Sequence, residues 1–371
     1  MWEKCTIGDV SEFSKERVNT QNLSSDNYVT TENMLQDYQG IIEASSVPTN
    51  TNVIKFNKGD VLLSNIRPYL KKVWFADKDG GCSADVFVFK ALSVCIPDFL
   101  HYIIANDRFI NFAMSGAKGV KMPRGDKEQM KTYEIGLPSV EEQKKIAQLL
   151  SLLDKRIATQ SKAIDKLQSL IKGINQEVFN EVGCSHKLGN ICEIKSGYSG
   201  NQLIKKEGLK VSRIETISGH QINLERVGYV SPFKNSESYK LQIGDILFSN
   251  INSVEYIGNT AFVDKDYDLY HGMNLLRLIP NNKIVVPFYL YLLLNTCKML
   301  NRFKTICNKA VSQASINQTD LGKTIIVLPS LENQIKICNI YEVLFSKIEA
   351  EKNCLSLYNM QKQYLLRQMF I

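Results

Sequence analysis

Two long stretches of the chain repeat a pattern of apolar and polar residues with a seven-residue period. Between 146 and 178 apolar residues recur at spacings of four and three, with one polar gap at Gln160. Residues 337–369 repeat the pattern, with gaps at Glu351 and Lys362. The apolar positions are Leu150, Leu153, Ile157, Ile164, Leu167, Ile171, Ile174 and Val178, then Tyr341, Leu344, Ile348, Leu355, Tyr358, Leu365 and Met369. This period predicts a left-handed coiled coil, and two amphipathic helices packed in separate cores are the alternative.

The order of the segments constrains how such helices can pair. The first helix ends where a second globular segment begins, so pairing with it requires the second helix to run back toward the start of the chain. We therefore predict an antiparallel rod with one globular module at each end. Gln160 and Glu351 would face each other near the middle, as a buried polar layer that fixes the register. A helix over residues 141–179 would be about 58 Å long.

The helix starts and the globular segments are duplicated as well. Each long helix follows a Leu-Pro-Ser triplet, and Ser139 with Glu142 forms a capping-box pattern that the second copy, Ser330 with Asn333, lacks. The strand pattern of 59–66, GDVLLSNI, returns at 244–251 as GDILFSNI. Pro97 and Pro287 mark the first turns of two buried helices.

The repeats define the fold class and the domains that we expect. The class is α+β (mixed α/β), with two globular modules, two long helices forming an antiparallel coiled coil, and an internal pseudo-two-fold repeat. Module 1 is residues 1–138 and module 2 is residues 183–329. The helical spacers are 139–182 and 330–371.

Composition indicates an ordinary two-domain protein. The chain has 371 residues, of which 44% are hydrophobic and 22% charged. Its nine cysteines contain no CxxC pair, so we interpret them as reduced thiols, mostly core fillers, and expect no metal at Cys184, His186 and Cys192. No signal pattern opens the chain, and the apolar stretch 284–294 is too short to cross a bilayer. We expect a cytoplasmic protein without membrane contact.

The positive charge is concentrated in one module. The net charge is +7; module 1 contains 16 basic and 17 acidic residues, whereas module 2 contains 17 basic and 11 acidic residues. Such a basic balance is weak support for nucleic-acid binding. Module 1 would need a local cationic patch to bind phosphate.

Motifs of catalysis are missing from the sequence. The tripeptide Gly322-Lys323-Thr324 is preceded by Asn317 where a phosphate-binding loop requires glycine. The four histidines show no metal or nucleophile spacing, and His101 is expected to pack in a buried helix. Asp60 and Asp245 are interpreted as turn residues before strands. A pair of similar modules without such motifs favours binding over catalysis.

Several segments together resemble the specificity subunit of a Type I restriction-modification system. They are LPSVEEQKKI and LPSLENQIKI at the helix starts, GDVLLSN and GDILFSN, YVTTENML at 28–35, and GVKMPRGDKEQM at 119–130. TENM has no match in module 2. The resemblance covers essentially the whole chain in the family's order, with a target recognition domain before each helix.

The resemblance implies a non-catalytic reader of a bipartite sequence in double-stranded DNA. It also implies two methyltransferase (modification) subunits and translocating restriction subunits as partners. S-adenosylmethionine and ATP would be bound by those partners, and this chain would hold no cofactor or metal. The recognised bases and the spacer length do not follow from the sequence.

Two segments of each module are candidates for DNA contact. One precedes the final strand of the module and is rich in cations, and the other follows the Gly-Asp strand. Arg, Asn and Gln suit base edges, whereas Lys mostly contacts phosphates. The candidates are Asn65, Arg67, Tyr69, Lys71, Lys118, Lys121, Arg124 and Lys127 in module 1, and Asn250, Asn252, Lys304, Lys309, Ser312 and Gln313 in module 2. A solvated polar loop is the alternative at each position.

Two other functions remain open. The specificity chain of a Type IIB-like enzyme, whose partner is a fused methylase-nuclease, would have nearly the same sequence pattern. A coiled-coil scaffold that joins two protein-binding modules would make no contact with DNA.

Overall fold

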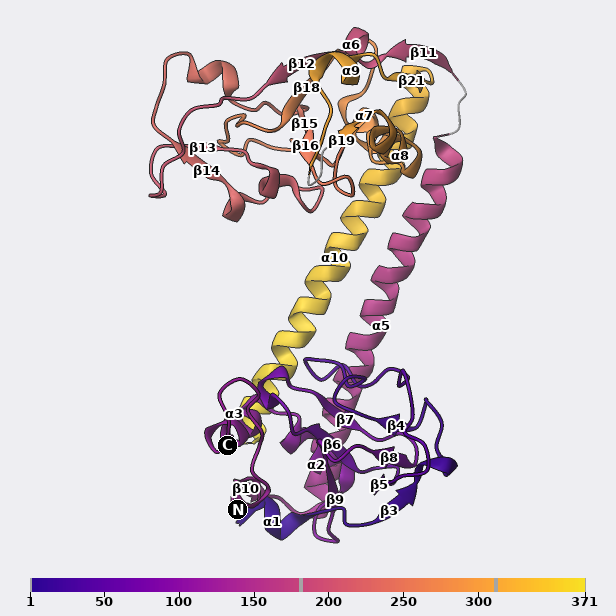
Figure 1. Ribbon diagram of the computed structural model, residues 1–371, viewed down its shortest axis with the longest axis vertical. Coiled ribbons are helices and arrows are strands. Elements are labelled where there is room, and N and C mark those ends of the chain that lie inside the picture. The colour runs from indigo at the N-terminus through magenta and orange to yellow at the C-terminus, as the bar shows by residue number, and fades with distance from the viewer. Residues whose placement is uncertain (1, 180–182, 310–312, 371) are drawn as a thin grey trace. The chain divides into compact units, whose positions relative to one another are not determined.

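A computed structural model describes residues 2–179, 183–309 and 313–370, which form two compact units (Figure 1). Unit 1 consists of Met1–Ala163 and Glu351–Ile371, and unit 2 of Ile164–Ala350. Each unit therefore combines one globular module with part of each long helix. The boundary between the units crosses the helices rather than falling at their ends.

Unit 1 is built on two four-stranded sheets. One has the order β2 (Ser11–Phe13), β9 (Val86–Ala91), β6 (Val61–Ser64), β7 (Val73–Phe75). The other has the order β3 (Arg17–Asn19), β5 (Asn52–Phe56), β8 (Gly80–Cys82), β4 (Tyr28–Val29). A further pair joins β1 (Glu3–Thr6) to β10 (Glu134–Leu137). The short helices are α1 (Ile7–Val10), α2 (Pro97–Ile104), α3 (Asp107–Ser115) and α4 (Lys127–Lys131), with 3-10 turns at Thr20–Asn22 and Pro68–Leu70.

Unit 2 repeats the first of these sheets. Its order is β12 (Cys192–Ser196), β18 (Leu276–Pro280), β15 (Ile246–Phe248), β17 (Thr260–Phe262). β11 (Cys184–Lys187) pairs with β21 (Ile325–Leu328), and β13 (Leu209–Val211) with β14 (Gly228–Val230). A small sheet has the order β16 (Ile251–Asn252), β20 (Ala314–Ser315), β19 (Asn308–Lys309). The helices are α6 (Leu188–Ile191), α7 (Pro287–Leu294), α8 (Cys297–Ile306) and α9 (Gln318–Gly322), with 3-10 turns at Ile214–Ile217, Leu224–Arg226 and Ser236–Tyr239.

The duplicated Gly-Asp strands separate two of the apolar clusters of each unit. Successive side chains of a strand point to opposite faces. Val61 and Leu63 of β6 pack in the cluster that includes α2, whereas Leu62 packs in a separate cluster with Trp74. In β15, Phe248 likewise belongs to one cluster and Leu247 to another. Both strands are buried on both faces, which explains their uninterrupted apolar sequence.

The aspartates before these strands are turn residues, as predicted. Asp60 accepts a hydrogen bond from the Asn57 N–H at 2.8 Å, and Asp245 accepts one from the Gln242 N–H at 2.6 Å. Asp245 also forms a buried ion pair with Arg277, with a distance of 2.6 Å between Nη2 and Oδ2. These carboxylates therefore hold the turns that lead into the strands.

A buried glutamine fixes each long helix to its module. Gln143 Oε1 accepts a hydrogen bond from the Ile96 N–H at 2.9 Å, next to Pro97 at the start of α2. Gln334 Oε1 accepts a hydrogen bond from the N–H of Val286, the N-cap residue of α7, also at 2.9 Å. Because burying an unpaired amide is costly, these bonds explain why glutamine recurs in both helix-start motifs.

The long helices are α5 (Val140–Val178) and α10 (Leu331–Met369). The capping box is present in α5, where the Ser139 N–H donates to Glu142 and the Glu142 N–H to Ser139 Oγ, each at 3.3 Å. In α10 the Asn333 N–H donates to Ser330 Oγ at 3.4 Å, and asparagine replaces the glutamate of the box. These contacts confirm the predicted starts of both helices.

Within each unit the two helices run antiparallel. In unit 1, Asp154 pairs with Lys362 at 2.5 Å, and the Gln160 side chain donates to the Glu351 carbonyl at 3.2 Å and to its carboxylate. In unit 2, Tyr341 donates to the Asn175 side chain. The predicted contact of Gln160 with Glu351 is therefore present, although both residues are half-buried rather than buried.

Among the described residues, no helix is both long and apolar enough to cross a membrane.

All nine cysteines are free, and five of them are buried, while Cys184 and Cys297 are exposed. Core filling therefore accounts for about half of them.

Candidate nucleic-acid interface

In unit 1 the two candidate segments are joined by backbone hydrogen bonds. Residues 118–124 form a hairpin in which Lys118 and Arg124 exchange two N–H to O bonds of 2.9 Å. The segment after β6 pairs with the C-terminal arm of this hairpin. The Arg67 N–H donates to the Pro123 carbonyl at 2.9 Å, and the Gly125 N–H to the Asn65 carbonyl at 3.2 Å. Residues nearly 60 positions apart thus share one surface.

Unit 2 repeats this pairing with different residues. β16 pairs with β20, which also pairs with β19, so that Ser315 lies opposite both Ile251 and Asn308. The Ile316 N–H donates to the Asn250 carbonyl at 2.8 Å, as Gly125 does to Asn65 in unit 1. The same backbone arrangement therefore presents candidate side chains rich in cations in unit 1 and rich in amides in unit 2.

Asn65 and Asn250 occupy equivalent places in this arrangement. Each follows its Gly-Asp strand, and each has a buried side-chain oxygen without a hydrogen-bond partner among the described residues. The Asn250 amide nitrogen donates weakly to the Ile316 carbonyl at 3.4 Å. Asparagine can bond both the N6 and N7 edges of adenine, but these two oxygens are buried, so contact with a base would require the side chains to turn outward.

Backbone strain shapes the loop that follows Asn65. Arg67 and Lys71 both lie in the left-handed region, with φ of 51° and 53°, on either side of the 3-10 turn Pro68–Leu70. Tyr69, within that turn, is 49% exposed. Left-handed non-glycine residues concentrate at functional loops, and here they turn an aromatic side chain toward solvent.

Most cations of the unit 1 surface are paired with carboxylates of the same unit. Lys71 pairs with Asp107 at 2.8 Å, Lys118 with Asp126 at 2.9 Å and Arg124 with Asp85 at 3.2 Å. The hydrogen bond from Lys118, with two backbone N–H groups, lowers the pKa of Asp126. The pairs of Lys118 and Arg124 are largely exposed and therefore weak, so a phosphate can replace the carboxylate at little cost, whereas the pair of Lys71 with Asp107 is half-buried.

The remaining predicted residues differ in position. Lys121 and Gln313 are exposed in their loops, and Lys309 is exposed in β19. Lys127 belongs to α4, with its ammonium 5.1 Å from the Phe13 ring centre and 5.2 Å from that of Phe87. Lys304 lies in the last turn of α8 rather than in a loop. The Asn252 amide donates to Ser249 at 3.1 Å, and Ser312 lies outside the described residues.

Several residues of this surface were not predicted from the sequence. They are Asp85 and Asp126, the partners of the cations, and Val120 and Met122, the exposed apolar residues at the hairpin tip. The GVKMPRG segment itself signals a turn between two cations. Nothing local in the sequence indicates the pairing with Asp85.

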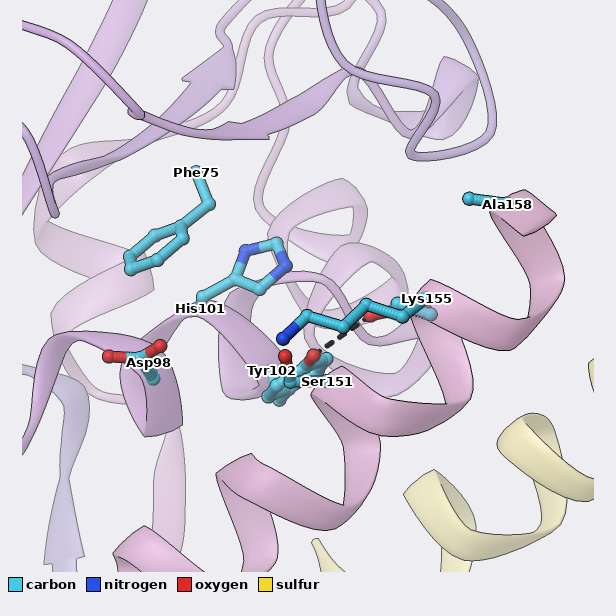
Figure 2. A pocket seen from close by; sticks show the side chains of 8 residues that line it. Phe75, Asp98, His101, Tyr102, Ser151, Lys155 and Ala158 are labelled. Atoms are coloured by element: carbon cyan, nitrogen blue, oxygen red, sulfur yellow. Dashed lines mark hydrogen bonds between the residues drawn. The ribbon is translucent and has the colours of Figure 1, made fainter.

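A pocket of about 370 Å³ in unit 1 lies between α2 and α5 (Figure 2). His101 stacks on Phe75 with ring centres 5.1 Å apart. Burial, together with the nearby Lys362, lowers the pKa of His101 to about 4, so the ring is neutral at neutral pH. The Tyr102 hydroxyl donates to Asp154 at 2.8 Å.

The contacts described at this pocket are packing and hydrogen bonding within unit 1. Among the residues that the structure describes, no group of three or more His, Cys, Asp or Glu side chains could hold a metal ion. The packing role predicted for His101 agrees with its ring contact. The duplicated loop surfaces remain the candidate functional site.

The family model and the related proteins that match this chain carry the same family description. The model of the Type I restriction modification DNA specificity domain matches residues 1–169 and again 185–356. A protein of Methanocaldococcus jannaschii named for the MjaX type I restriction enzyme specificity subunit is 41% identical over 180 residues, which is 48% of this chain and 42% of the relative. The MjaVIII specificity subunit from the same organism is 26% identical over 386 residues, covering 95% and 88%.

Solved structures share the fold at low sequence identity. The S subunit of a Type-I restriction-modification system from M. genitalium has a TM-score of 0.63 at 17% identity, covering 100% of this chain and 96% of that one. A chain from a structure of complex assembly and conformational transition in the type I R-M system has a TM-score of 0.62 at 22% identity, covering 99% and 97%. The likeness extends over the whole chain.

Proposed function

Because the chain belongs to the family of Type I restriction-modification DNA specificity domains, we propose that it reads a bipartite sequence in double-stranded DNA. Each unit would bind one half-site through its own loop surface. The observation that carries this proposal is the duplicated pairing of the segments after β6 and β15 with the segments before β10 and β21. Two equivalent surfaces with different side chains suit a target with two different halves.

The side chains of these surfaces support separate roles in recognition. Lys118, in an exposed and weak ion pair, can exchange its carboxylate partner for a phosphate, which positions the duplex without reading its sequence. Asn65 and Asn250 have the amide chemistry for base edges, which they would reach by turning their buried oxygens outward. In unit 1, Arg124 can form the bidentate pair with guanine once Asp85 is displaced.

The chain would act as the non-catalytic component of a larger complex. Modification subunits would bind S-adenosylmethionine and methylate adenine, and restriction subunits would use ATP for translocation and cleavage. These steps would take place on cytoplasmic DNA. The purified chain, incubated with a labelled methyl donor and genomic DNA, should transfer no label. Clear adenine methylation by the chain alone would contradict this division of roles.

Duplicated apolar residues on the long helices support docking of two modification subunits. Leu149 and Leu152 on α5 are 42% and 52% exposed. Their equivalents 191 positions later, Ile340 and Val343 on α10, are 49% and 69% exposed. Each unit thus offers one apolar pair three residues apart on a helix, a spacing that places both side chains on one face. Two copies of one partner would bind two such faces.

Retention on duplex DNA tests the proposal against a scaffold function. The chain in complex with a modification subunit should retain duplexes of its recognised sequence and release them as salt rises. Indifference to DNA under all conditions would favour the scaffold. A partner that carries methylase and nuclease on one polypeptide would instead identify a Type IIB-like system.

A further inference from the structure

The hairpin of unit 1 presents an apolar tip in the middle of the candidate interface. Val120 is wholly exposed, with a relative exposure of 103%, and Met122 is 55% exposed. Neither side chain contributes to the core clusters of the unit. A single exposed apolar residue is ordinary, but two at the tip of a fixed turn form a small apolar projection.

The stem holds this tip in a defined position. The two bonds between Lys118 and Arg124 close the hairpin, and the bonds to Asn65 and Arg67 fix it against the segment after β6. Gly119 has a φ of +97°, and a Cβ there would lie 3.3 Å from the Met122 carbonyl oxygen. The turn is therefore tight, and its apolar side chains project from an anchored base.

The charges around the tip indicate what it meets. Residues 116–125 contain three cations and no acidic residue. Lys121, between the two apolar residues, is exposed and has no ion pair with any described carboxylate. Duplex DNA combines a phosphate exterior for the cations with an apolar base stack for the tip. Apolar side chains inserted at a base step are an established way in which proteins unstack and kink DNA.

We propose that the Val120–Met122 tip inserts into the half-site bound by unit 1 and unstacks one base step, while Lys121 contacts an adjacent phosphate. This inference rests on the proposed DNA-reading function. Unstacking costs least at flexible pyrimidine–purine steps. The tip would therefore select such a step without forming any hydrogen bond to its bases.

The experiment uses the complex of the full chain with its modification subunits and duplexes of the sequence that the methylome identifies. Each adenine of the unit 1 half-site and its flanks is replaced in turn by 2-aminopurine, whose fluorescence rises when it unstacks. We compare the native chain with V120S/M122S, with V120L/M122L, which keeps an apolar tip, and with V94S. Val94 is 48% exposed in unit 1 outside the hairpin and serves as the matched control.

Binding of the native complex should raise the 2-aminopurine fluorescence at one position. The V120L/M122L and V94S variants should give the same rise at that position. V120S/M122S should lose that brightening at saturating protein and bind the duplex about tenfold more weakly. Brightening that persists in V120S/M122S would come from elsewhere, including base flipping by the partner, and would overturn the proposal. If the native complex binds its sequence specifically without any rise in 2-aminopurine fluorescence, the insertion of the tip is refuted while the DNA-reading function stands. Failure to retain any sequence would reject both.

Discussion

Replacing one duplicated apolar pair should remove one modification subunit from the complex. The variants are L149S/L152S in unit 1 and I340S/V343S in unit 2. Full burial of a leucine or isoleucine is worth about 1.5–3 kcal/mol, and roughly half of each side chain is exposed. Covering a pair therefore contributes about 2 kcal/mol, so its loss should weaken docking about thirtyfold at that site.

A titration followed by native mass spectrometry measures this effect. At a partner concentration that gives the native chain two modification subunits, each variant should carry one, and the four-residue variant none. L357S/M360S is the matched control. Leu357 and Met360 on α10 are 64% and 65% exposed at the same spacing, but their equivalents on α5 are Lys166 and Ser169.

The control also accounts for the lower helix propensity of serine. Two bound subunits on all variants, or equal loss with L357S/M360S, would refute docking on the duplicated faces. If a variant still binds two modification subunits, each with a lower affinity, then each apolar pair contributes to the binding of both subunits.

Three further outcomes are expected. Removing module 2 in a chimera should flatten the dependence of DNA affinity on salt more than removing module 1, by about 0.9 in log–log slope for each lost phosphate contact; equal slopes would contradict the charge asymmetry. Seven residues inserted after both Gln160 and Glu351 keep the heptad phase and add about 10 Å of helix, so the methylome should show the same half-sites with a spacer one to three base pairs longer. Arg277→Met should lower the free energy of unfolding by about 3–5 kcal/mol in chemical denaturation, because it leaves the buried Asp245 carboxylate without its cation; an effect below 1 kcal/mol would contradict that reasoning.

Periodic features of the sequence predicted the fold well. The heptad pattern located both long helices, and the gaps at Gln160 and Glu351 identified a contact between residues far apart in the chain. Proline and serine positions located the helix starts because capping is a local interaction. The recurrence of glutamine in the two helix-start motifs was visible, but its buried role required the structure.

The candidate site was less accessible from the sequence. The segments after β6 and before β10 were each identified as candidates, but their pairing is a non-local backbone interaction without a side-chain pattern. The ion pairs of Lys118 and Arg124 depend on how loops fold together. The apolar tip at Val120 and Met122 appears in the sequence as two hydrophobic residues among many, and only exposure distinguishes it.

Adenine methylation across the genome tests the central claim most directly. Cells with the intact chain and its modification partner should show methylation at one two-part sequence, and deletion of the chain should abolish it. Exchange of residues 183–329 for those of a related chain should change one half of the sequence and leave the other. Methylation that persists without the chain, or an exchange that changes both halves or neither, would contradict a reader with one half-site in each unit.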